Sequence, residues 1–182
     1  DTWDVNMDMT STFTCGYGYI KWRNVTKEDE LSASGDAYTS IDFPLFRTAD
    51  AYLMAAEAIL RGASGTKSEA LGYVNEVRTR AYMSGKYAKN GVRSDVSGEI
   101  GANELDLDFL LLERQKELAS ELIRRTDLIR FGKYTKGNNW DWKNGVRLGE
   151  DVDDKYNLFP IPESELTNNP TLVQNDGYKV IK

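Results

Sequence analysis

The sequence predicts a mainly α fold of paired helices, flanked by extended, loop-rich segments. Apolar residues recur every three or four positions in separate stretches between residues 47 and 131, which is the period of amphipathic helices. All four prolines lie outside that range, where they cannot interrupt a helix. We therefore expect three regions. Residues 1–46 should form an aromatic N-terminal loop or strand, and residues 47–132 a helical core. Residues 133–182 should form a loop followed by an ordered, proline-bearing C-terminal segment.

The first helix is expected over residues 47–61. Its apolar positions follow the spacing that places side chains on one helical face: Ala49, Tyr52, Leu53, Ala56, Ile59 and Leu60. Gly62 and Gly65 follow directly, as is typical of helix C-termini.

The second helix is expected to open at a capping box, in which Thr66 and Glu69 satisfy each other's backbone donors. Its apolar stripe comprises Leu71, Val74, Val77 and Ala81. Since only a short turn separates it from the first helix, the two should form an antiparallel hairpin.

A third helix is expected over 105–122 and a fourth over 124–131, ending at Gly132. Three acids fall at i, i+4 spacing on one face of the third helix: Glu113, Glu117 and Glu121. Paired carboxylates are used by glycosidases, but several arginines lie close in the sequence. We favour a structural ion-pair lattice that joins the third helix to the fourth.

The flanking segments contain extended and turn signals. Residues 17–22 alternate in the manner of a short strand, and Leu158–Pro162 should be extended because of its two prolines. One helical turn is expected over 163–166, and Gly177 should take a positive φ in a turn. The acidic run 149–154 lacks the EF-hand spacing, so we interpret it as a solvated loop and predict no metal site.

Composition narrows the possible functions. The 182-residue chain is 40% hydrophobic with a net charge of −6, which suits a folded domain and disfavours a nucleic-acid surface. It has no histidine, which excludes Ser-His-Asp and Cys-His catalysis and His-containing zinc sites. We therefore expect a binding protein, not an enzyme, that needs no cofactor.

Two groups of aromatic residues are the candidate glycan-binding sites. Trp140 and Trp142 lie in a polar loop beside Asn138 and Asn139, and the second group comprises Tyr17, Tyr19 and Trp22. A Trp or Tyr ring that stacks on a sugar removes apolar area from water and adds a polar handle. The alternative is that each ring packs under its own loop.

The order of helices resembles tetratricopeptide (TPR-like) hairpins, without a clean 34-residue repeat. Five motifs in order also resemble the C-terminal part of the SusD/RagB family of outer-membrane nutrient-binding lipoproteins. They are Arg47–Ala58, Val74–Ala81, Glu113–Ala119, Arg125–Gly132, and Phe159–Pro162 with Asn169-Pro170 and Gln174-Asn175. Two positions depart from the family pattern: Thr126 stands where an aromatic is frequent, and Asp176 where proline is frequent.

The resemblance implies a non-catalytic protein at the bacterial cell surface that captures an oligosaccharide or polysaccharide. The implied partner is a SusC-like TonB-dependent outer-membrane transporter, and the implied membrane association is a lipid anchor outside this chain. Because residue 1 is Asp and no signal peptide follows, we expect a processed or truncated chain. A TPR-like protein-interaction scaffold without a small ligand, and a carboxylate-dependent glycoside hydrolase, are the alternatives.

Overall fold

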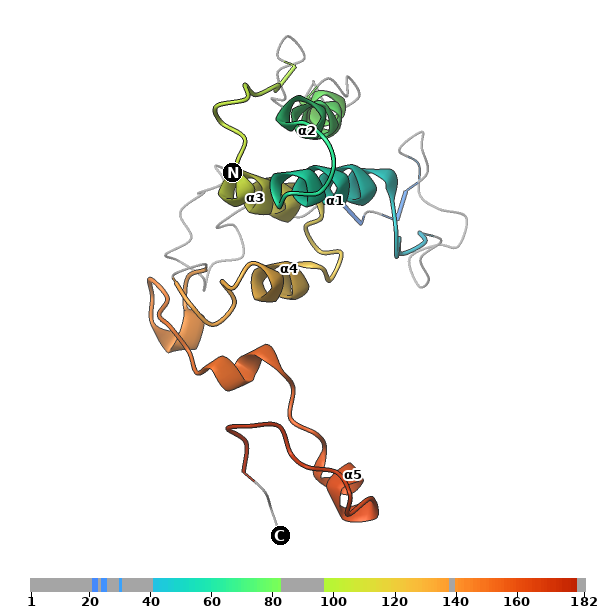
Figure 1. The fold of residues 1–182 in the computed structure, drawn as a ribbon. Coiled ribbons are helices and arrows are strands. Elements are labelled where there is room, and N and C mark those ends of the chain that lie inside the picture. The colour runs from blue at the N-terminus through green and yellow to red at the C-terminus, as the bar shows by residue number, and fades with distance from the viewer. Residues whose placement is uncertain are drawn as a thin grey trace. The chain divides into compact units, whose positions relative to one another are not determined.

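The computed structural model describes residues 21–22, 24–25, 30, 41–82, 97–137 and 140–179. The chain divides into two compact units, residues 1–44 and 45–182 (Figure 1). In the first unit the Trp22 ring stacks on Phe43, with centroids 5.5 Å apart. Lys21 and Trp22 lie in a turn, so the strand predicted over 17–22 is wrong at these two residues; residues 17–20 lie outside the described part.

Helices α1 (Thr48–Leu60) and α2 (Lys67–Tyr82) form the predicted hairpin (Figure 1). The capping box is confirmed, because the Glu69 amide donates to Thr66 Oγ1 at 3.2 Å and the Thr66 amide donates to Glu69 Oε2 at 2.6 Å. The core between the helices buries Leu53, Ala56, Val74 and Val77 from the predicted apolar faces. It also buries Ala70, which was not predicted, whereas Ala81, predicted on the apolar face of the second helix, is exposed.

Helix α3 (Leu107–Glu117) packs against α1 and shares the core of the α1–α2 hairpin, and α4 (Arg124–Arg130) packs against α3 (Figure 1). The Asp106 carboxylate caps α3 by accepting from the Phe109 amide at 2.7 Å. Leu105 and Leu110 are fully buried in the same core.

The third helix ends five residues earlier than predicted. Ser120 and Leu122 adopt left-handed φ angles of 59° and 62°, which break the helix after Glu117. The break leaves Leu122 exposed and returns the chain so that α4 can pack on α3. The apolar residues at 118 and 122 have helical spacing, which is why the sequence predicted a longer helix.

The C-terminal segment is held both by contacts within itself and by Arg125 of α4, which donates to the carbonyls of Tyr156 and Asn157 at 2.9 and 3.1 Å. It contains the short 3-10 turns η2 (Lys143–Gly145) and η3 (Asp154–Asn157), followed by α5 (Glu163–Asn168). The Gln174 side chain accepts from the Ile161 amide at 2.8 Å and donates to the Ile161 carbonyl at 2.9 Å. Gly177 takes the predicted positive φ, at 81°. The mainly α, TPR-like fold class is thus confirmed.

Candidate functional site

The aromatic loop, residues 134–151, is the part of the predicted site that the structure describes best. Trp140 and Trp142 remain 41% and 59% exposed, whereas Lys143, the residue after Trp142, is almost completely buried. Trp142 and Asn144 have left-handed φ angles of 62° and 58°, which turn the chain sharply on either side of Lys143. The turn therefore directs a lysine inward and leaves two indole rings accessible.

Polar contacts hold this loop closed at its base. The Gly137 amide donates to Asp151 Oδ1 at 2.6 Å, and the Gly137 carbonyl accepts from Lys143 Nζ at 2.8 Å. Asn144 Nδ2 donates to Glu150 Oε1 at 2.6 Å. These contacts join the two arms of the loop, so the positions of the indole rings are set by specific side chains.

The two indole rings differ in their surroundings. Trp140 lies against Tyr134, with centroids 5.9 Å apart, and Lys143 Nζ lies 5.1 Å from its ring centroid. Trp142 is the more exposed of the two. Trp140 thus combines packing with accessibility, whereas Trp142 is the freer stacking surface. Asn138 and Asn139 lie outside the described residues.

The second predicted patch is only partly described. Trp22 is half-buried and packs on Phe43, and Tyr17 and Tyr19 lie outside the described residues. What the structure shows at Trp22 is a packed ring in the first unit.

The glutamate row is held by arginines, as the ion-pair interpretation predicted. Glu113 pairs with Arg78 at 2.6 Å. Arg47 binds Glu117 at 2.5 Å and Glu121 at 2.8 Å, and Arg80 also pairs with Glu117. The predicted partners were wrong in part, because these arginines come from α2 and from the residue before α1, far from the glutamates in the sequence.

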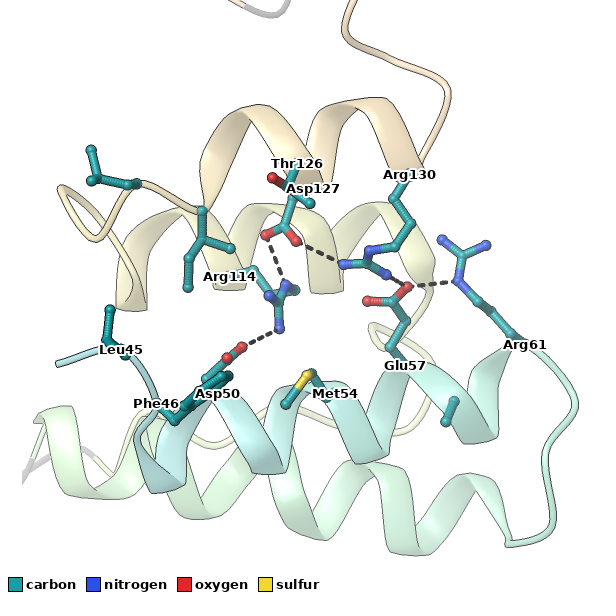
Figure 2. A pocket seen from close by; sticks show the side chains of 13 residues that line it. Leu45, Phe46, Asp50, Met54, Glu57, Arg61, Arg114, Thr126, Asp127 and Arg130 are labelled. Carbon is teal, nitrogen blue, oxygen red and sulfur yellow. Dashed lines mark hydrogen bonds and ion pairs between the residues drawn. The ribbon is translucent and has the colours of Figure 1, made fainter. Parts of the chain in front are cut away.

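Arg114 supplies the predicted link between α3 and α4. It is 3% exposed and donates to Asp50 at 2.9 Å and to Asp127 at 2.8 Å, which ties three helices together (Figure 2). Asp127 also accepts from Arg130 at 2.7 Å. Removing one partner from a buried pair of this kind is destabilising, because it leaves the other charge uncompensated.

The acidic run after the aromatic loop is tied to its neighbours. Thr135 Oγ1 donates to Asp154 Oδ1 at 2.6 Å. This hydrogen bond, and then the Lys136 ammonium, lower the pKa of Asp154 below its ordinary value. Within the described ranges, His, Cys, Asp and Glu side chains form no cluster of three suited to a metal ion. None of the helices described has the length and apolarity needed to cross a bilayer.

The helices and the aromatic loop together define a mainly α, TPR-like protein with exposed indole rings on a loop. The chain belongs to the SusD family, whose model matches residues 3–178. It is 38% identical over 176 residues to the starch-binding protein SusD of Bacteroides thetaiotaomicron, and 30% identical over 151 residues to the SusD-like protein P2 of Formosa agariphila. These alignments cover 96% and 81% of this chain.

The fold agrees with a solved structure of the same kind. The surface glycan-binding protein A of Bacteroides thetaiotaomicron, in complex with laminarihexaose, matches with a TM-score of 0.56 and 28% identity over 81% of this chain. The chain spans 28% of the length of each of the two relatives and 27% of that solved chain.

Proposed function

We propose that this chain is part of a non-catalytic glycan-binding protein of the bacterial outer-membrane surface. Membership of the SusD family is the observation that carries the proposal. A relative named for starch binding and a solved relative bound to laminarihexaose both point to an oligosaccharide or polysaccharide ligand. The full-length protein is held to the membrane by a lipid anchor and delivers its ligand to a SusC-like TonB-dependent transporter.

Within this chain we assign glycan contact to the aromatic loop. Trp142 and Trp140 offer two rings one residue apart, on a turn fixed by Lys143 and Asp151. Burying about 100 Å² of ring against a sugar contributes roughly 2.5 kcal/mol before ordering costs, so two rings are needed for useful affinity. The proposed role of Asn138 and Asn139 is to hydrogen bond to sugar hydroxyls beside the rings.

The test is an alanine substitution at each ring. Trp142→Ala should reduce retention in gels containing starch or laminarin by roughly tenfold, because roughly 2.5 kcal/mol of ring burial less about 1 kcal/mol of ordering cost leaves about 1.5 kcal/mol. It should leave the melting temperature unchanged. Trp140→Ala should reduce retention and also lower the melting temperature, since this ring packs on Tyr134.

Trp22→Ala is the matched control in the other aromatic group. Normal retention by both loop variants, together with weakened retention by Trp22→Ala, would move the site to residues 17–22. Normal retention by all three variants would remove both groups as the site.

The same proteins test the absence of catalysis. We propose that Glu113, Glu117 and Glu121 are structural, because each pairs with an arginine. No reducing sugar should then be released from a bound glucan. Release that disappears in Glu117→Gln would instead identify a hydrolase.

A further inference from the structure

Cationic and aromatic side chains form a continuous row that joins α4, the C-terminal segment and the aromatic loop. The Arg125 guanidinium lies 4.2 Å from the ring centroid of Phe159 and 4.9 Å from that of Tyr134. The centroids of Tyr134 and Trp140 are 5.9 Å apart, and Lys143 Nζ lies 5.1 Å from the Trp140 centroid. We call these residues the cation–aromatic row and define it as Phe159, Arg125, Tyr134, Trp140 and Lys143.

Backbone carbonyls hold both cations of the row in place. Arg125 Nη2 donates to two carbonyls of η3, at 2.9 and 3.1 Å. Lys143 Nζ donates to the Gly137 carbonyl at 2.8 Å. A cation is attracted to the negative face of an aromatic ring, and two rings at this spacing attract each other in tilted or offset arrangements. The Trp140 ring therefore contacts two groups, the Tyr134 ring and the Lys143 ammonium, that are each held by a further contact.

These contacts restrain Trp140 without covering it. The residue remains 41% exposed, so part of the ring faces water although Tyr134 and Lys143 lie against it. A side chain that is already held in its bound orientation loses less conformational freedom on binding, so more of its stacking energy contributes to affinity. Arg125 is a half-buried residue of α4, outside the loop, and it reaches Trp140 through Tyr134.

We infer, building on the proposed function, that Arg125 is a positioning residue for glycan binding. Its guanidinium restrains Tyr134, Tyr134 restrains Trp140, and Trp140 meets the sugar in an orientation that is set before the ligand arrives. Through this row a residue of the helical core contributes to affinity without touching the glycan.

The first test replaces Arg125 with Met, which removes the cation and its donors and keeps an unbranched apolar stem. Retention of the full-length protein in gels containing starch or laminarin should fall roughly twofold to fivefold, which corresponds to the loss of one cation–π contact. Arg61→Met is the matched control, because its guanidinium lies 4.5 Å from the Phe131 centroid and is not part of the row. Retention of the control should not change, and an equal fall in both variants would overturn the inference.

A double-mutant cycle tests whether Arg125 acts through Trp140. The effect of Arg125→Met should disappear in a Trp140→Ala background and persist in a Trp142→Ala background, because Trp140 belongs to the row and Trp142 does not. An effect that persists in both backgrounds would mean that Arg125 supports the loop in general, and would contradict a role through Trp140.

Fluorine NMR observes the ring directly. In the full-length protein labelled with fluorotryptophan, the resonances of Trp140 and Trp142 are assigned by replacing each residue with Phe. Without glycan, Arg125→Met should move or broaden the Trp140 resonance and leave that of Trp142 in place. Arg125→Lys keeps a cation, so it should move the Trp140 resonance less. A Trp140 resonance that Arg125→Met leaves unmoved would rule out the positioning role.

The binding measurements separate this inference from the proposed function. A wild-type protein that no glucan gel retains would overturn both. Retention that depends on Trp140 and Trp142 but not on Arg125 would overturn the positioning role alone and leave the proposed function standing.

Discussion

Arg114 is a buried arginine that binds two buried carboxylates in the second unit. Its guanidinium is 3% exposed and lies between the carboxylates of Asp50 and Asp127, which are 7% and 2% exposed. Removing one partner from a buried ion pair leaves the other charge uncompensated in a medium that solvates it poorly. Removing Arg114 would leave Asp50 uncompensated and Asp127 with only its ion pair to Arg130.

We expect Arg114→Met to lower the free energy of unfolding by about 3–5 kcal/mol, measured by urea denaturation, because buried Asp50 loses the guanidinium that binds it and Asp127 keeps only Arg130. Arg80→Met is the matched control. The Arg80 side chain is 58% exposed in its pair with Glu117, and such surface pairs contribute about 0–1 kcal/mol. Equal losses in the two variants would show that burial does not set the strength of these pairs.

The contribution of Asp154 to stability depends on pH, and the sign of this dependence follows from its lowered pKa. The hydrogen bond from Thr135 favours the ionised carboxylate in the folded state. Its contribution to stability is therefore complete above the unfolded-state pKa of about 4, and is lost as the pH falls through the lower folded-state value. A carboxyl-carbon NMR titration should show the pKa of Asp154 rising towards its ordinary value in Thr135→Val. An unchanged titration would assign the shift to Lys136 instead.

At the scale of elements, the sequence predicted helices well and their long-range connections poorly. Apolar spacing located α1, α2 and α4 to within a residue or two, and the Thr66–Glu69 capping box marked the start of α2. The end of α3 was missed because no glycine marks the left-handed residues Ser120 and Leu122. Long-range pairs such as Arg47 with Glu121 depend on tertiary packing, which local sequence does not encode.

The candidate site was predictable only in its residue types. Aromatic rings beside asparagines identified the loop, but the burial of Lys143 was not foreseen, since lysines in polar loops are usually exposed. The turn that buries it uses left-handed conformations at Trp142 and Asn144, for which only the asparagine is a recognisable signal.

The hairpin-like course of the C-terminal segment depends on Gln174. Its side chain makes both hydrogen bonds that a neighbouring strand would make with Ile161. We expect Gln174→Leu to speed limited proteolysis within residues 158–178 severalfold while reducing global stability by about 1–2 kcal/mol at most. Gln115→Leu, at an exposed position on α3, makes the same replacement without touching this segment. If both variants are cleaved alike, Gln174 does not hold the segment.

For the molecule as a whole, the net charge of the chain and the contacts that bind the ligand can be considered separately. The chain carries a net charge of −6, whereas the proposed contacts are uncharged ring faces and amides. Screening acts on charged interactions and leaves stacking largely unaffected. Binding of a neutral glucan should therefore depend little on ionic strength.

We expect retention on a neutral glucan to change by less than about twofold between roughly 0.05 and 0.5 M NaCl. Affinity electrophoresis in matched gels, or calorimetry at the two salt concentrations, would measure this. A marked fall in affinity with salt would indicate an anionic glycan and a role for basic residues near the site, such as Lys136 or Arg147.

The hydrogen bonds between the Gln174 side chain and the Ile161 backbone also make the C-terminal segment a suitable site for inserting a peptide. Gln174 and Asn175 fasten its two arms at Ile161 and Phe159, so the residues between them, including α5, form a closed loop with a fixed base. Its tip, Asn168–Thr171, is exposed. An epitope or reporter peptide inserted there would extend outward while the base stays fastened, which offers a way to mark the protein without altering its helices or its aromatic loop.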